Sequence, residues 1–261
     1  MNRYKPLMTT GILLFLGTGF VSSQAQDETI TFEDDQQILT RLSENLSMDQ
    51  ISLKSFRCHE KLVVTQAEAK GQTQTKREWL NLYRVERQQN RQVATRVTFR
   101  ETRVWQKSPE GEEPSSLADL PVLDSPFTGA LNQIFDLENR YANDFHKERQ
   151  EVINGDNCQV LQFDTVPQLT GQHISVLGKS VPLRVQGQLW IRLSDNRLLR
   201  IDAKQRKLPK GCRNYEFQID YQPQVLFGKQ LYLPVHTRLK IERKDKRYVV
   251  EQEYFDFEAL P

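Results

Sequence analysis

Histidine and cysteine are the side chains whose spacing bears most directly on catalysis, and here their spacing indicates no active site. His59, His146, His173 and His236 occur in none of the H-x-x-E, H-E-x-x-H or H-x-H arrangements that commonly bind metals. Cys58 precedes His59 within a strand pattern, where neighbouring side chains point to opposite faces and cannot pair as nucleophile and base. We therefore predict no metal site and no catalytic residue.

Longer catalytic motifs are missing from the sequence as well. There is no G-x-S-x-G elbow, no P-loop and no G-x-G-x-x-G segment. We expect no cofactor and no enzymatic activity, and a hydrolase whose site is assembled from distant residues is the third-ranked alternative.

The cysteines leave two interpretations open. Cys58, Cys158 and Cys212 form no C-x-x-C pair and are too few for a disulfide scaffold. One disulfide of unknown pairing with one free thiol is the first interpretation, and burial of all three as small core residues is the second.

The first 25 residues predict the compartment. A short basic start precedes an uncharged, mostly apolar run over 7–21, and Ser23 and Ala25 occupy the −3 and −1 positions of a cleavage site. This pattern is typical of a secretory signal peptide over 1–25, and no cysteine near the cleavage site would take a lipid. We expect export to the periplasm or the extracellular space, without integration into a membrane. A retained amino-terminal anchor is the alternative.

Charge excludes one class of partner. The chain has 36 Lys and Arg against 34 Asp and Glu, and residues 1–25 contain two of the basic and none of the acidic residues. The remaining residues therefore carry 34 basic and 34 acidic side chains, so no overall positive charge is available to bind nucleic acid.

Residues 197–247 are nevertheless rich in Arg and Lys. They are either solvated strand faces or a basic surface toward anionic head groups or an acidic partner.

The hydrophobic period changes from helical to extended along the chain. Residues 31–47 place Ile38, Leu39, Leu42 and Leu46 on one stripe of an amphipathic helix. Alternating strand patterns follow, separated by polar turns, and the carboxyl-terminal ones align Tyr215 with Phe217. The strand patterns cover 55–67, 76–87, 91–105, 145–153 and 157–166, a hairpin over 187–204, and three segments beyond 212.

Several connections can be read from composition. We expect a loop over 106–123, followed by a short apolar helix over 124–140. Gly155 and Asp156 should form a strand turn, and 167–183 has no steady period and should be a connection forming a mobile rim. Pro234 lies inside a strand pattern and indicates an edge or a bulge.

These elements predict a mainly β (α+β) fold. A large curved antiparallel sheet would form an incomplete barrel covered by one or two amphipathic helices. The acidic amphipathic helix over 26–50 would be part of this domain. Residues 51–261 would form its single half-barrel, with a loop and helix insertion at 106–140.

The hairpin "GQLWIRLSDNRLLRI" (187–201) and the segment "YQPQVLFGKQLYLPVHTRLKI" (221–241) carry a family resemblance. Together with the leader and the acidic helix, they resemble the LolA/LolB-like periplasmic half-barrel superfamily, which includes outer-membrane lipoprotein carriers and the amino-terminal domain of RseB (MucB). The likeness covers most of 50–261. The chain departs from the family by its many Arg and Lys residues and its 106–123 insertion. The resemblance implies a binding protein with an apolar cavity for lipid or lipoprotein acyl chains.

The expected function is therefore an exported envelope protein that binds a lipid-like or lipoprotein-acyl ligand. The alternative is a protein-interaction or sensor module of the envelope that uses the basic region 197–247.

The hairpin should place Leu189, Ile191 and Leu193 on one side, with Leu199, Ile201 and Ala203 facing inward. The residues that would form the lid and the cavity wall, if they are not ordinary core, are Phe127, Leu131, Ile134, Phe135, Leu189, Ile191, Leu199, Ile201, Tyr215 and Phe217.

Overall fold

The alternating segments of the sequence form strands in a computed structural model of the chain. The structure describes residues 35–68, 74–88, 91–107, 126–127, 143–165, 173–177 and 179–260. Its elements, in chain order, are α1 (Asp35–Ser52), β1 (Phe56–Glu68), β2 (Gln74–Gln88), β3 (Arg91–Lys107), β4 (Asn143–Ile153), β5 (Asp156–Thr165), β6 (His173–Val176), β7 (Lys179–Pro182), β8 (Val185–Arg192), β9 (Leu198–Gln205), β10 (Cys212–Leu226), β11 (Lys229–Arg243) and β12 (Lys246–Ala259).

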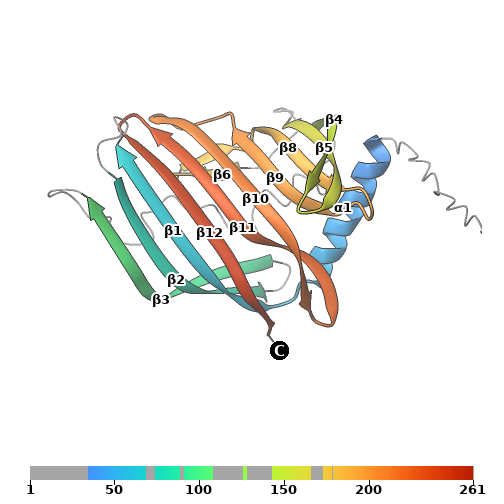
Figure 1. Cartoon of the computed structure of the whole chain (residues 1–261), viewed down its shortest axis with the longest axis horizontal. Coiled ribbons are helices and arrows are strands. Elements are labelled where there is room, and N and C mark those ends of the chain that lie inside the picture. Colours follow the sequence, from blue (N-terminus) through green and yellow to red (C-terminus); the bar gives the residue numbers. More distant parts are fainter. Residues whose placement is uncertain are drawn as a thin grey trace, which may run out of the picture. The chain divides into compact units, whose positions relative to one another are not determined.

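Ten of these strands form one antiparallel sheet (Figure 1). Its order is β3-β2-β1-β12-β11-β10-β9-β8-β5-β4, so the first strand pairs with the last one and two meanders are joined in the middle. Within the described residues β3 and β4 remain the two edges, and the sheet does not close. The predicted fold class, an incomplete antiparallel barrel with a covering helix, is confirmed.

One face of the sheet is mainly apolar, and we call it the inner face. Strand β1 illustrates the alternation, because every second residue from Phe56 to Val64 is buried while the residues between them are exposed or half-buried. Four of these five buried residues are apolar, and the fifth is Glu60. Cross-strand pairs continue the buried row from β1 through β12 and β11 to β10, as in Val64 with Val250 and Val250 with Leu239.

Helix α1 packs on the inner face near the edge formed by β4, β5, β8 and β9 (Figure 1). Ile38, Leu39 and Leu42 are buried in the same cluster as the sheet residues, and Leu46 packs against that cluster. The predicted stripe is confirmed, although the helix continues to Ser52 rather than ending at residue 47. No helix among the described residues is long and apolar enough to cross a membrane.

The connection expected over 167–183 contains a hairpin instead. Strands β6 and β7 pair with each other in a separate two-stranded sheet. Ile174, Val176, Val181 and Leu183 are buried in the cluster of the inner face. The irregular spacing of these apolar residues reflects two four-residue strands, which are too short to produce a readable period.

A bulge corrects the predicted face of one hairpin residue. Leu189 pairs with Ile201 and Trp190 with Arg200, but Ile191 then pairs with Leu198, so Leu199 is the extra residue. Leu198 therefore lies on the inner face, while Leu199 is buried on the opposite, outer face.

The ends of both hairpins differ from the prediction in detail. Leu193 lies beyond the end of β8 and is 37% exposed rather than part of the inner row. In the β8–β9 turn Asn196 adopts a positive φ of 56°. The turn between β4 and β5 is formed by Asn154 and Gly155, both at positive φ, and Asp156 already begins β5.

The bulge predicted near Pro234 is present. Asp220 pairs with His236 and Tyr221 with Pro234, so Val235 is the additional residue. Strand β11 lies between β10 and β12 in the sheet order, and the irregular pairing is how a proline is accommodated there.

Other expectations fall outside the described residues. They are the signal peptide over 1–25 and the helix over 124–140 apart from Pro126 and Phe127, which form a turn. The loop expected over 106–123 is wrong for Gln106 and Lys107, which end β3, and its remainder lies outside the described residues. The described residues belong to one compact unit that includes α1.

Candidate ligand-binding face

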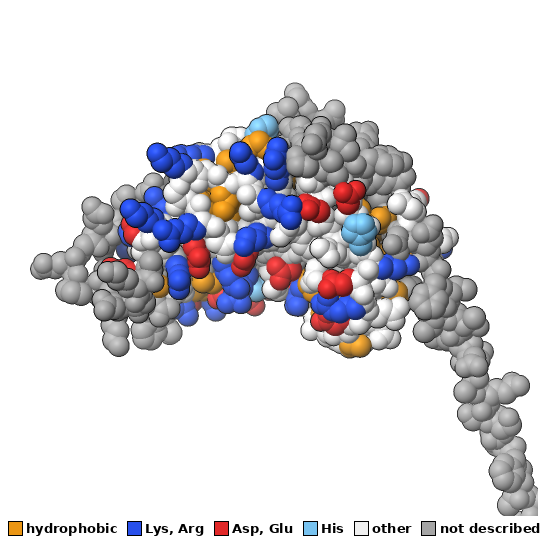
Figure 2. Space-filling view, turned by 90° about the horizontal axis from the view of Figure 1, so that it is seen from above, with side chains coloured by type: hydrophobic (Ala, Val, Ile, Leu, Met, Phe, Trp, Pro, Cys, Tyr) orange, Lys and Arg blue, Asp and Glu red, His pale blue; other side chains and the backbone are white. Residues whose placement is uncertain are grey.

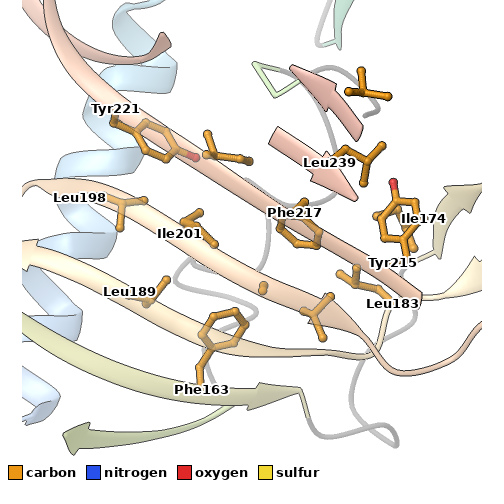
Figure 3. Packing of buried hydrophobic residues seen from close by; sticks show 14 of the residues in the cluster. Phe163, Ile174, Leu183, Leu189, Leu198, Ile201, Tyr215, Phe217, Tyr221 and Leu239 are labelled. Carbon is orange, nitrogen blue, oxygen red and sulfur yellow. The ribbon is translucent and has the colours of Figure 1, made fainter. Parts of the chain in front are cut away.

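The larger part of the inner face is a continuous apolar cluster, which we call the main inner cluster. It joins α1, the β6–β7 hairpin and the sheet from β2 through β12 to β5. Figure 3 shows side chains of neighbouring strands on one side of the sheet, with Ile174 and Leu183 beside Tyr215. Its most buried large members are Tyr215, Phe163, Phe217, Leu42, Leu62, Leu161, Leu183, Leu189, Ile191, Leu198 and Ile219.

A smaller cluster occupies the other end of the same face and is built mainly from aromatic rings. Phe127 lies at its centre, with ring centroids 5.3 Å from Phe56, 5.6 Å from Tyr83 and 5.0 Å from Tyr254. We call it the aromatic inner cluster. Edge-on packing of this kind adds to the stabilisation that burial gives, so the Phe127 ring packs firmly against β1, β2 and β12.

A buried polar network separates the two inner clusters. Glu60 accepts hydrogen bonds from Asn81 Nδ2 at 2.8 Å and from Gln252 Nε2 at 2.9 Å. Gln252 Nε2 also donates to the Tyr254 hydroxyl, and Thr237 Oγ1 donates to Gln252 Oε1, both at 2.9 Å. Glu60, Asn81, Thr237 and Gln252 are all fully buried. Such a network stabilises a fold only while its members stay paired, so it fixes how β1, β2, β11 and β12 align.

Helix α1 is attached to the sheet by polar contacts as well as by its apolar stripe. Asn45 Nδ2 donates to the carbonyl oxygens of Asp195 and Asn196, at 2.9 and 3.1 Å. Asp49 accepts from Arg197 at 2.5 Å and from the backbone N–H of Tyr232 at 3.3 Å. Burial raises the pKa of Asp49, although Arg197 opposes this effect. The turn between β8 and β9 is thus the docking site of the helix.

The cysteines are free thiols in three separate places. Cys58 belongs to the aromatic inner cluster, Cys158 to a cluster on the outer face, and Cys212 packs against the margin of the main inner cluster. Burial raises the pKa of all three thiols, which disfavours the nucleophilic thiolate.

The outer face carries a small apolar cluster bordered by charges. Trp190 and Leu199 are buried there, with the Arg200 guanidinium over the Trp190 ring at 5.8 Å. Asp220 accepts hydrogen bonds from Arg200 at 2.5 Å and Gln218 at 2.9 Å, and its Oδ2 lies 3.2 Å from His236 Nδ1. Burial alone would raise the pKa of Asp220, but bonds from His236, Arg200 and Gln218 lower it.

The basic region 197–247 divides into paired and unpaired residues. Arg197, Arg200, Lys204, Arg206, Arg238 and Arg247 each lie in an ion pair with Asp or Glu. Lys207, Lys210, Arg213, Arg243 and Lys244 are exposed and have no ion pair with any described residue. The view from above in Figure 2 shows Lys and Arg gathered on that face, with some acidic side chains among them.

The structure brings half of the predicted site residues together. Leu189, Ile191, Ile201, Tyr215 and Phe217 all lie in the main inner cluster. Phe127 covers the aromatic inner cluster, and Leu199 is excluded from the inner face by its bulge. The remaining predictions, Leu131, Ile134 and Phe135, lie outside the described residues.

The sequence analysis did not predict the polar network, although polar residues at inward positions of the strand patterns indicate it. Glu60 stands between Cys58 and Leu62 in the buried phase of β1, and Asn81 stands between Trp79 and Tyr83 in β2. A polar residue at an inward position of a strand is costly without partners. Several such residues on different strands therefore predict a shared hydrogen-bond network.

Acidic and metal-ligating side chains show no cluster at this face. Within the described part of the chain, no group of three or more His, Cys, Asp or Glu residues could hold a metal ion.

Comparison with known proteins gives a distant likeness. No family model matches the sequence, and no curated protein does. A DUF1329 family protein from Desulfovibrio piger is similar over 85% of this chain and 92% of its own, at 14% identity and a TM-score of 0.35. A LolA superfamily protein from Nitrosomonas europaea is similar over 87% and 94%, at 16% identity and a TM-score of 0.34.

The MucA/MucB complex of Pseudomonas aeruginosa is also similar, over 84% of this chain and 93% of that one, at 10% identity and a TM-score of 0.23. The solved structures thus include members of the superfamily that the hairpin resembles. Because the identities and TM-scores are low, the function of this chain has to be inferred from its own residues.

Proposed function

We propose that this protein is a non-enzymatic, exported binding protein that takes a lipid-like or acyl ligand against the inner face of its half-barrel. The observation that carries the proposal is the one-sided sheet. Its inner face carries the main and the aromatic inner cluster across β1, β2, β5 and β8 to β12, divided by the polar network around Glu60, whereas charged side chains occupy much of its outer face. The main inner cluster offers an acyl chain a continuous contact surface.

The elements that cover this face are few. Among the described residues they are α1, the short β6–β7 hairpin and the turn that carries Phe127. The contacts of α1 combine an apolar stripe with two polar side chains, Asn45 and Asp49. A ligand that enters beneath these elements exchanges their apolar contacts for its own, so binding does not require a large preformed opening.

The first test is lipid analysis of the purified protein. Native mass spectrometry and solvent extraction should find copurified lipid, and titration with a fluorescent fatty acid should saturate. Phe127→Ala should raise the affinity for the fatty acid, because the ring no longer competes for the aromatic inner cluster. Phe255→Ala, at a ring stacked on His59 rather than in an inner cluster, is the matched control and should leave the affinity unchanged.

The result that would overturn the proposal is equally direct. Protein that carries no lipid, shows no saturable fatty acid binding and responds alike to both phenylalanine variants has an inner face that is ordinary core. Circular dichroism and thermal unfolding of each variant separate a loss of binding from a loss of folding.

A further inference from the structure

Five exposed basic residues without ion pairs lie together at one end of the sheet. The β9–β10 connection contains Lys207 and Lys210, and Arg213 follows at the start of β10. The register of β10 with β11 places Cys212 opposite Arg243, so the β11–β12 turn with Lys244 lies beside that connection. We call Lys207, Lys210, Arg213, Arg243 and Lys244 the basic rim.

Acidic residues are scarce around this rim. The stretch 206–213 contains no Asp or Glu, and the β11–β12 turn contains only Asp245. Two acidic residues lie at the margin: Glu68, opposite Lys246 in the register of β1 with β12, and Glu242, which forms an ion pair with Arg247. Five cations with so few anions among them repel one another, so the rim is stabilised by an external anion.

Along β12 the charge changes toward the other end of the sheet. Strand β12 begins with Lys246 and Arg247 and ends in a stretch with Glu253, Asp256 and Glu258, all three of them exposed. The charge of β12 is therefore graded along the strand direction, although Glu258 forms an ion pair with Arg57 of β1. A graded charge orients the molecule in the field of an anionic surface, with the basic rim foremost.

Apolar side chains adjoin the rim. Leu208, Cys212 and Tyr248 are partly buried and pack against the main inner cluster. They alternate in sequence with Lys207, Lys210 and Arg213 and with Arg247. This combination of flexible cations and partly exposed apolar groups suits a lipid head-group layer, which provides anions above an apolar interior.

We propose that the basic rim docks this protein on a membrane surface rich in anionic phospholipid, so that the adjacent end of the inner face meets the bilayer. Docking is electrostatic and reversible, since no apolar element long enough to insert belongs to the rim. Docking determines the location of the protein at the membrane. It is independent of ligand binding, because the inner face can bind a ligand whether or not the protein is docked.

The test is co-sedimentation of the full chain with vesicles. Vesicles that contain phosphatidylglycerol should retain the protein, pure phosphatidylcholine vesicles should not, and added salt should release it. The triple variant Lys207→Glu, Lys210→Glu, Lys244→Glu should bind about a hundredfold more weakly, because each of the three lysines near an anionic surface contributes about fivefold.

The matched control makes the same change in net charge elsewhere. Lys54, Lys147 and Lys229 are exposed lysines outside the rim, and their triple replacement by Glu should leave vesicle binding within about twofold. Circular dichroism confirms that both variants fold. Fatty acid titration without vesicles should give wild-type affinity for both, which separates docking from the proposed ligand binding.

Two results would overturn the docking proposal. One is absence of binding to anionic vesicles by the wild-type protein, including the case in which the rim lysines instead crosslink to an acidic envelope protein. The other is an equal loss of vesicle binding in the rim variant and its control, which would assign the effect to net charge alone.

Discussion

Asp49 on α1 and Arg197 beyond the β8–β9 turn form an ion pair of 2.5 Å across 148 residues of sequence. Both side chains are shielded, with exposed fractions of 9% for Asp49 and 21% for Arg197. Asp49 also accepts from the backbone N–H of Tyr232, so one carboxylate joins α1 to both β11 and the hairpin turn. The β8–β9 turn therefore has a structural role, because it holds α1 on the inner face.

Replacing Arg197 by Ala should weaken this attachment. The change leaves the buried carboxylate of Asp49 without its cation and should lower the free energy of unfolding by about 2 kcal/mol. Urea denaturation provides the measurement. Arg206→Ala removes a solvent-exposed pair with Asp164 and should cost less than about 0.5 kcal/mol. Equal effects of the two variants would show that the attachment of α1 contributes nothing specific.

The ion pair of Arg197 with Asp49 changes the choice of residues for charge reversal in the basic region. Arg197 and Arg200 belong to the basic region and would be natural choices for charge reversal in search of a partner. Both are engaged within the fold, Arg197 with Asp49 and Arg200 with Asp220. A lost interaction after their reversal would report a disturbed fold, whereas Lys207, Lys210 and Lys244 test the surface itself.

Thr237→Val should reveal the energetic role of the polar network. The variant keeps the shape of the side chain but removes the hydroxyl that donates to Gln252 Oε1. A buried acceptor left without its donor should lower the free energy of unfolding by about 1 to 3 kcal/mol. Thr65→Val, at a half-buried position of β1, is the control and should be close to neutral. A neutral Thr237→Val would mean that the network does not constrain the sheet.

His236 should make stability depend on pH. Its hydrogen bond with Asp220 raises the pKa of His236 above the ordinary 6.5, against partial burial, with support from Glu251 and Glu253. The protonated ring binds Asp220 better in the folded state. Its contribution is therefore fully present below pH 6.5 and is lost as pH rises through the folded-state pKa.

The measurement is the free energy of unfolding from pH 6 to pH 9 in wild type and in His236→Gln, which keeps a donor but does not titrate. The difference between the two proteins should shrink as pH rises. An NMR titration that places the pKa of His236 at or below 6.5 would contradict the assignment.

Gly187→Ala should destabilise the β8–β9 hairpin. A Cβ at this position would lie 2.1 Å from the backbone oxygen of Asp202 and 2.8 Å from Cβ of Ala203. Because the obstacle is backbone, the strands must move apart, which should cost about 1 to 3 kcal/mol. Thermal unfolding checks this, with Gly155→Ala as a comparison in which strain comes from a positive φ and not from crowding. An unchanged midpoint for Gly187→Ala would show that the close approach is relieved at no cost.

Strand patterns of period two were sufficient to predict most strands of the sheet and the inward positions of Tyr215 and Phe217, and the helical period predicted the stripe of α1. Leu199 was misplaced because it is the extra residue of a bulge, so that Leu198 takes the inner position while Ile201 keeps its own. Nothing in "DNRLLRI" specifies where the extra residue falls. The pairing of β1 with β12 and of β5 with β8 depends on contacts distant in sequence, which local periodicity does not contain.

The candidate site was predictable only in part for a related reason. Periodicity identifies which residues of a strand point inward, and it correctly grouped Leu189, Ile191 and Ile201. It does not identify which other elements cover them. The burial of Ile174 and Val181 in the same cluster follows from how the β6–β7 hairpin packs, which is a tertiary property.

Photocrosslinking of an acyl probe tests the central claim most directly. A fatty acid with a photoreactive group in its chain is bound to the protein and irradiated, and labelled peptides are mapped by mass spectrometry. We predict saturable labelling, competed by unlabelled fatty acid, at inner-face residues of β8 to β12 such as Leu189, Phe217 and Leu239. Labelling that does not saturate, or that falls on the outer cluster around Trp190 and Leu199, would contradict the account.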